Sequence, residues 1–206
     1  MKLFFALQRL MDKIRGLDFL APVAIRIYLA PIFILAGSNK LANVEGVAQW
    51  FESLGMPAPE LMVYLAGGTE LIGGIALIGG LAIRWVTIPL MATMVVAAVT
   101  AHWENGWHVA PETELTAPWE WRTDLIEEGV EKRDRARAIL REHGNYSWLT
   151  SAGSITINKN GIEWAATYFI MLLALWSLGG GRFFSLDYWI RRQFDHEFET
   201  QPGSHG

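Results

Sequence analysis

The chain contains four apolar segments, each about as long as a helix that crosses the hydrocarbon core of a membrane. In order, they are residues 19–38, 61–83, 85–101 and 162–180. None of them separates into an apolar and a polar face with the helical period of 3.6, as a helix on the surface of a soluble domain would. The buried helices of a soluble bundle are therefore the weaker alternative. The pattern predicts an all-α fold, an integral membrane four-helix bundle that forms a single membrane domain over residues 1–206.

The first sixteen residues show a different, amphipathic pattern. Leucines and other apolar residues recur at helical spacing, and the remaining face is basic, with Lys2, Arg9, Lys13 and Arg15. Helices with this composition lie in the plane of the membrane surface. We therefore predict an N-terminal interfacial helix over residues 1–16, with an extension of the first span as the alternative. No small-residue cleavage site of a signal peptide follows it.

A long extramembrane loop, residues 103–161, separates the third span from the fourth. Residues 122–144 of this loop are predicted to form a charged helix, in which Glu128 and Lys132 stand four positions apart in the favourable order. This helix is either a solvated surface or a docking surface for a partner. Lysine and arginine lie mainly beside the two termini, so the positive-inside rule predicts cytoplasmic N and C termini. In a bacterium, the chain would be a multi-pass protein of the inner membrane.

Two charged residues fall inside predicted spans, where a charge costs about 2.5–3.5 kcal/mol on the mildest scale. They are Arg26 in the first span and Glu70 in the second. Counted at about 1.5 Å per residue, their levels in the membrane differ by only about 5 Å. We therefore hypothesise that Arg26 and Glu70 face each other, either as a structural ion pair or as a site of proton exchange. Gly67 and Gly73, beside Glu70, allow close approach of a neighbouring helix or of a flat ligand.

Further polar residues are predicted at the outer ends of the spans. Lys40 ends the first span, His102 ends the third and Glu163 begins the fourth. Histidine titrates near neutral pH, so His102 is either a proton relay to the outer water layer or a simple interface residue. The spacing from His102 to His108 matches no standard zinc motif, and we predict no metal site.

Two classes of chemistry have no support in the composition. The chain has no cysteine, which excludes disulfides, thiol redox relays and cysteine metal sites. It also has no basic cluster with interleaved aromatic residues, so we predict no nucleic-acid partner.

Several longer motifs together resemble the DoxX family of four-helix membrane proteins. They are "FILAGSNKL" after Arg26, then "WFESLGMPAPEL", "GGTELIGGIALIGGLAIRW", "AHWENGW" and "INKNGIEWAATYFIMLLALWSLGGGRFFSLD". The resemblance covers residues 20–110 and 155–190, and the insert 111–154 departs from the compact family pattern. It implies a link to quinone-coupled redox chemistry, because some relatives are membrane subunits of thiosulfate:quinone oxidoreductases. Family-typical polar positions fall on Arg26, Lys40, Glu70, His102 and Glu163.

These observations lead to one principal expectation and two alternatives. The first is a quinone-linked redox subunit in the membrane lipid, in which Glu70, Arg26 and His102 act on protons. Gly67, Gly73, Lys40 and Glu163 would contact the quinone head group, with no covalently bound cofactor. A partner redox subunit or a directly reacting substrate would supply the electrons, and the chain could form a homo-oligomer. The alternatives are a non-enzymatic scaffold or assembly factor that holds a partner through loop 111–154, and a carrier of an ion or small solute.

Overall fold

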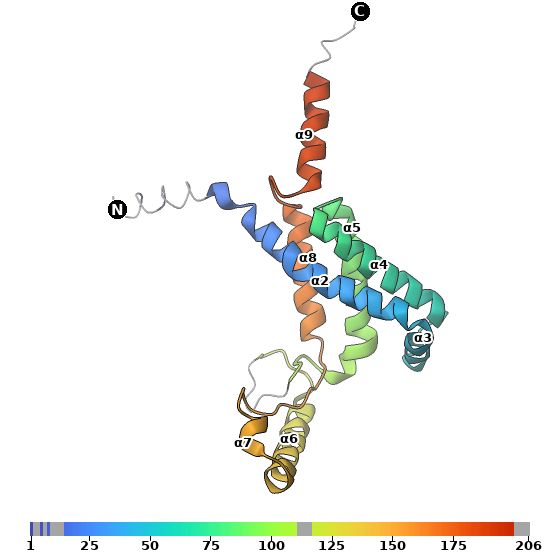
Figure 1. Ribbon diagram of the computed structural model, residues 1–206, viewed down its shortest axis with the longest axis vertical. Helices are drawn as coiled ribbons and strands as arrows, with labels where there is room; N and C mark the ends of the chain where they lie inside the picture. The colour runs from blue at the N-terminus through green and yellow to red at the C-terminus, as the bar shows by residue number, and fades with distance from the viewer. Residues whose placement is uncertain (2–4, 6–7, 9–14, 111–116, 200–206) are drawn as a thin grey trace, which may run out of the picture. The chain divides into compact units, whose positions relative to one another are not determined.

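The protein is described by a computed structural model, shown in Figure 1, for residues 1, 5, 8, 15–110 and 117–199. Every regular element in this part of the chain is a helix, so the predicted all-α class is confirmed. The interfacial helix predicted over residues 1–16 lies almost wholly outside the described residues, as does part of the insert 111–154.

Three helices are long and apolar enough to cross a membrane, judged by length and composition. They are α2 (Leu20–Ala42), α4 (Pro59–Gly79), and α5 (Ile83–Ala97) with the π and 3-10 turns that continue it, η2 (Ala98–His102) and η3 (Trp103–Asn105). The fourth predicted span corresponds to α8 (Glu163–Leu178), which is apolar but only 16 residues long. The three longer helices confirm a membrane protein, and the fourth span remains a prediction.

The remaining helices are shorter or more polar. The predicted charged helix over 122–144 is confirmed as α6 (Thr123–His143), and the short α7 (Tyr146–Leu149) follows it. This α7 was not predicted from the sequence, and neither were α3 (Val44–Ser53) and α9 (Leu186–Glu199). The helix α3 begins where the Asn43 side chain accepts a hydrogen bond from the backbone N–H of Gly46, which is a typical N-cap.

The chain divides into two compact units. The first, which we call the helical unit, consists of residues 1–93 and 169–206. The second, which we call the loop unit, consists of residues 94–168.

In the helical unit, α2 and α4 run side by side at very short range (Figure 1). A Cβ atom on Gly37 would lie 2.5 Å from the backbone nitrogen of Leu71, and one on Gly74 would lie 3.0 Å from the carbonyl oxygen of Ala30. Contacts this short require glycine, as at other close crossings of membrane helices. The glycines therefore determine which residues of α2 and α4 stand at the same level.

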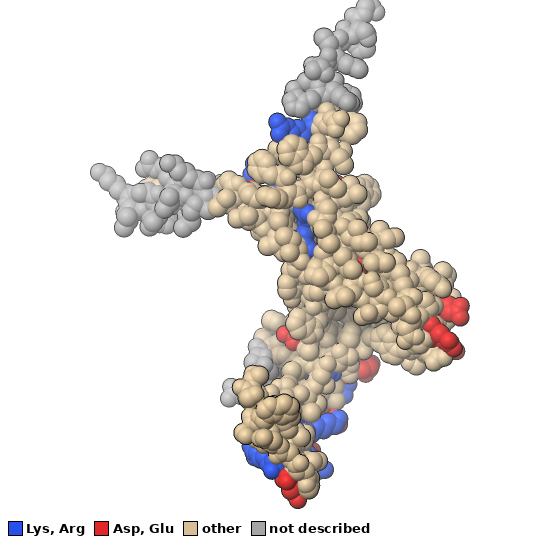
Figure 2. Space-filling model, viewed as in Figure 1, with Lys and Arg blue, Asp and Glu red and all other residues tan. Residues whose placement is uncertain are grey.

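Large apolar side chains cover the outer surface of these helices, as expected for a surface that faces lipid. Ile27 of α2 and Ile72 of α4 are 65% and 68% exposed, while Leu29, Val63 and Leu77 are fully buried between the helices. On the face seen in Figure 2, charged side chains gather over α3 and α6, and few lie over α2 and α4. Burial inside the unit and apolar surface outside it are both typical of membrane helices.

Candidate functional site

A buried ion pair joins α2 to α4. The ammonium group of Lys40, in the last turn of α2, lies 2.6 Å from Oε2 of Glu70, in the middle of α4. The Glu70 side chain is only 5% exposed and that of Lys40 is 23% exposed. The positive charge of Lys40 is also favourable at the C-terminal end of its helix, where the helix dipole is negative. Two predicted site residues are thus brought together, but not the two that were predicted to pair.

The predicted pair of Arg26 with Glu70 is wrong. The guanidinium group of Arg26 donates to the carbonyl oxygens of Leu77 (2.7 Å) and Ile78 (2.8 Å) at the end of α4. It also donates to the carbonyl oxygens of Gly180 and Phe184, which follow α8. A guanidinium carries five N–H donors, and the last carbonyls of a helix have no partner within it. Arg26 therefore satisfies the end of α4 and is itself 2% exposed.

The register of the two helices explains this error. Close contacts at Gly37 and Gly74 set α2 against α4 so that Arg26 lies at Gly80, where a Cβ atom would be 2.8 Å from the guanidinium carbon. The segment from Glu70 to Gly80 corresponds to about 15 Å along a helix. Counting residues from the ends of the predicted spans gave the wrong relative levels, because the contacting glycines set the levels instead.

Other polar groups complete the end of the bundle around Arg26. The hydroxyl of Ser185 donates to the carbonyl oxygen of Gly80 at 2.8 Å. The carboxylate of Asp187 accepts the backbone N–H groups of Ala82 (2.6 Å) and Ile83 (2.9 Å), at the start of α5. The sequence analysis did not predict this role of Asp187. The only feature of the sequence that indicates it is the position of Asp187 just after a glycine-rich turn. These bonds tie the α4–α5 turn to Ser185, just before α9, and to Asp187 in the first turn of α9.

The glycines predicted to approach a ligand contact protein atoms. A Cβ atom on Gly67 would lie 3.0 Å from the Leu41 side chain, and one on Gly73 would lie 2.8 Å from the Leu90 side chain. Among the four glycines that flank Glu70, only Gly68 has open space at the Cβ position. The structure therefore gives Gly67 and Gly73 a role in close helix packing, and their contact with a quinone remains a prediction.

In the loop unit, His102 and Glu163 both hold the backbone together. Nδ1 of His102 lies 2.9 Å from the carbonyl oxygen of Asn160, and Oε2 of Glu163 accepts the backbone N–H of Val109 at 3.0 Å. Because a carbonyl oxygen only accepts, Nδ1 of His102 carries the proton, and its Nε2 is the nitrogen left to exchange protons in the neutral ring. The proton-relay role of His102 remains a prediction. Among the described residues, no three side chains of metal-binding type could hold a metal ion.

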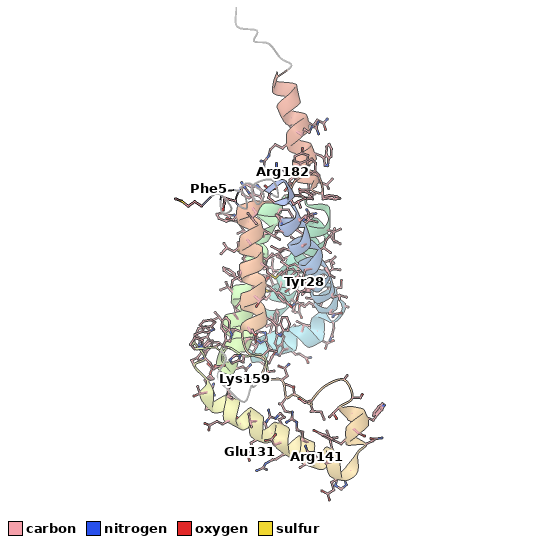
Figure 3. The ribbon with its side chains drawn as sticks, turned by 90° about the vertical axis from the view of Figure 1, so that its left-hand side faces the viewer. Phe5, Tyr28, Glu131, Arg141, Lys159 and Arg182 are labelled. Atoms are coloured by element: carbon pink, nitrogen blue, oxygen red, sulfur yellow. The ribbon has the colours of Figure 1, made fainter. Side chains whose placement is uncertain are left out.

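A second buried ion pair, which sequence reasoning missed, lies in the same unit. Nζ of Lys159 (labelled in Figure 3) is 2.7 Å from Oε2 of Glu120, and the two side chains are 4% and 0% exposed. The Glu120 carboxylate also accepts the backbone N–H groups of Trp107, His108 and Arg122, at 2.8–3.1 Å. The only sequence signal was a glutamate between two tryptophans.

The surroundings of Glu120 determine its protonation. Burial alone would raise the pKa of this carboxyl, but the hydrogen bonds from Lys159 and from the backbone of Arg122, His108 and Trp107 outweigh burial and lower the pKa to about 2. Gly106 has φ +76°, and a Cβ atom there would overlap Oε1 of Glu120. The glycine therefore makes room for the carboxylate.

The fold and the first ion pair define an all-helical membrane protein with charged residues paired between two of its membrane-length helices. Residues 21–103 match the model of the DoxX family, in agreement with the resemblance that the sequence motifs carry. The match includes Arg26, Lys40, Glu70 and His102 and ends before Glu163. Comparison with curated proteins and with solved structures found no match.

Proposed function

We propose that this DoxX-family membrane protein is a quinone-linked redox subunit, and that the Lys40–Glu70 pair exchanges protons with the quinone head group. One observation carries the proposal. Lys40 is the only hydrogen-bond partner that Glu70 has among the described residues, although a carboxylate offers about four acceptor positions. A charged group held inside a membrane helix with so few partners is costly, and such groups commonly mark sites of proton or ligand handling.

The two residues would have different roles. Lys40 is 23% exposed and Glu70 only 5%, so a head group would reach the pair from the Lys40 side. The Lys40 ammonium would donate a hydrogen bond to a quinone carbonyl oxygen and would transfer its proton as that oxygen is reduced. Glu70 would keep Lys40 charged and in position.

The proposed reaction is balanced as follows. One quinone takes up two electrons and two protons and forms one quinol. Lys40 would deliver one proton, then regain it from water, and the second proton would come from water at the head group. Both electrons would come from a partner redox protein or a reduced sulfur compound, the donor class that the family resemblance implies.

The roles first predicted for the other residues change in one respect. Lys40 takes the place of Arg26 beside Glu70, and Arg26 supports the end of α4 instead. His102 is retained as a proposed relay to the outer water layer, and Glu163 as a proposed contact of the quinone head group. The distribution of lysine and arginine supports a bacterial inner-membrane location with both termini cytoplasmic.

A second candidate function is a scaffold that holds a partner protein through loop 111–154. It is favoured by large apolar side chains that are exposed on α6 and α7. Ile139, Trp148 and Leu149 are 60%, 71% and 42% exposed. Patches of this kind on an extramembrane surface commonly mark protein contacts.

The first experiment measures quinone binding and quinol formation by the purified full-length protein in lipid nanodiscs, with reduced sulfur compounds as donors. Glu70→Gln removes, at almost constant shape, the charge that keeps Lys40 protonated and in position. We expect quinol formation to fall by roughly 100-fold, because proton transfer from Lys40 is then lost and such losses are usually of this size. Lys40→Gln should also weaken quinone binding.

The matched control is Glu120→Gln, which breaks a buried Lys–Glu pair of the same length in the other unit. It should lower stability and leave quinol formation per folded molecule unchanged. If the wild type binds no quinone, or if Glu70→Gln lowers only the melting temperature, the redox proposal is wrong. Deleting residues 112–150 tests the scaffold: loss of a co-purifying partner without loss of folding would support it.

A further inference from the structure

A cavity of about 470 Å³ lies at the end of the helical unit where α2 begins. Its walls come from three places in the chain: the start of α2, the α4–α5 turn and the segment from the end of α8 into α9. Arginines are prominent among its lining residues, with Arg84, Arg182 and Arg191. The volume falls within the range typical of sites for small ligands and cofactors.

Basic residues outnumber acidic ones around the cavity by three to two. Two aspartates also line it, but both are already engaged. Asp18 accepts a hydrogen bond from Arg182 at 2.6 Å, and Asp187 accepts two backbone N–H groups at the start of α5. No ion pair to Arg84 or Arg191 is present among the side chains that the structure describes. Arg84 donates to the carbonyl oxygen of Ser177 at 3.3 Å, which leaves its other N–H donors and the guanidinium of Arg191 for an anionic ligand.

One of these arginines lies beside a stretch of bare backbone in the cavity wall. Gly179 forms part of the wall with φ +80°, and a Cβ atom there would meet only Nε of Arg84, at 3.8 Å. The nearest group to this bare stretch of backbone is thus a guanidinium. Guanidinium groups bind phosphate through two parallel N–H···O bonds, more specifically than an ammonium does.

The surroundings of the cavity resemble the surface layer of a membrane. Trp85, which lines it, is 78% exposed. The helix α9 carries an exposed apolar stripe, with Leu186, Trp189, Ile190 and Phe194. Arg191 and Arg192 lie between these positions, and a helix of this composition typically lies in the head-group layer. Tryptophan favours the same layer.

We propose that this cavity binds the phosphate group of an anionic phospholipid, with Arg84 and Arg191 as its principal ligands. The inference rests on the cavity, its unpaired arginines and the membrane-surface character of α9, and it is independent of the quinone proposal. Arg182 (labelled in Figure 3) contributes after exchange of its Asp18 partner, since both side chains are more than half exposed.

The test is native mass spectrometry of the full-length protein, released from nanodiscs that contain phosphatidylglycerol and phosphatidylcholine in equal amounts. We expect the wild type to retain phosphatidylglycerol about 30-fold over phosphatidylcholine, as roughly 1 kcal/mol for each of the two principal arginines implies. The double variant Arg84→Gln/Arg191→Gln should lose most of this preference.

The control is Arg192→Gln, which removes the same charge from the same helix. Arg192 stacks on Trp189, with its guanidinium carbon 5.5 Å from the ring centre, and does not line the cavity. This variant should change the preference less than twofold. If the double variant does not fold, Arg191→Gln alone serves, because Arg191 is exposed.

Three outcomes would overturn the proposal. Equal retention of the two lipids would show that the head group is not recognised. An equal loss in Arg192→Gln would show only a diffuse attraction to charge. If inorganic phosphate displaces phosphatidylglycerol and stabilises the wild type equally in detergent, the cavity takes soluble phosphate compounds, not lipid.

Discussion

The protein contains two buried Lys–Glu pairs of almost the same length, 2.6 Å for Lys40–Glu70 and 2.7 Å for Lys159–Glu120. The carboxylates differ in what else they accept. Glu120 accepts hydrogen bonds from three backbone N–H groups in addition to Lys159. Among the described residues, Glu70 accepts a hydrogen bond from Lys40 alone.

This difference suggests different uses. A carboxylate with its acceptor positions filled is held in one place and in one protonation state, which suits a structural clasp between loop segments. A carboxylate with positions left over can accept a further donor or a proton. The same two residue types, at almost the same distance, thus have surroundings that favour a structural role in the loop unit and leave acceptor positions for the proposed proton exchange in the helical unit.

The largest expected effect comes from removing Glu120. In Glu120→Ala, Lys159 would be left as a buried charge and three backbone N–H groups would lose their acceptor, so we expect a loss of about 3–5 kcal/mol in the free energy of unfolding of the loop unit. Hydrogen–deuterium exchange should show lost protection in residues 106–109 and 158–163, with α2 and α4 unchanged. Unchanged protection there would mean that the pair does not hold this unit together.

The contribution of the Lys159–Glu120 pair to stability should also depend on pH. The pKa of Glu120 lies at about 2 in the folded protein, below its ordinary value of 4.5. A lowered pKa gives stability that is fully present above pH 4.5 and is lost as the pH falls through 2, by roughly 3 kcal/mol in total. Fluorescence of the nearby tryptophans should follow this loss, and Glu120→Gln should remove the pH dependence. A transition of the same size in that variant would assign it to other groups.

The pair in the helical unit should contribute less to stability. We expect Glu70→Gln to cost only about 1–2 kcal/mol, because the partly exposed Lys40 can extend its long side chain to the head-group layer. A double-mutant cycle should show coupling between Lys40 and Glu70, and none beyond about 0.5 kcal/mol between Arg26 and Glu70. Strong coupling of Arg26 to Glu70 would contradict the register described here.

Exposed ion pairs should contribute least to the free energy of unfolding. On α6, Lys132 pairs with Glu128 and Arg135 with Glu131 (labelled in Figure 3), each with both side chains about half exposed or more. Lys132→Gln should therefore change the free energy of unfolding by no more than about 0.5 kcal/mol. A clearly larger loss would indicate that α6 is covered by another molecule, which would favour the scaffold function.

The positions of the long helices could be predicted from the sequence. An apolar segment in a membrane must satisfy its own backbone hydrogen bonds, so length and composition alone require a helix. The predicted spans 61–83 and 19–38 accordingly differ from α4 and α2 by only a few residues at each end. The short α3 and α9 were missed because brief amphipathic segments carry a weaker signal.

The sequence by itself also determined which residues needed partners, because the cost of a charge among apolar residues depends only on the residue and its neighbours in the chain. Arg26 and Glu70 were found in this way, and Lys40 by its place at the outer end of the first span. Which of them meet was decided by the tertiary structure, through the contacts of Gly37 and Gly74 that set α2 against α4. The pairing of Glu120 with Lys159 likewise depends on how the loop unit folds. A hydrogen bond needs atoms within about 3 Å, and only the packed helices and loops determine positions that closely.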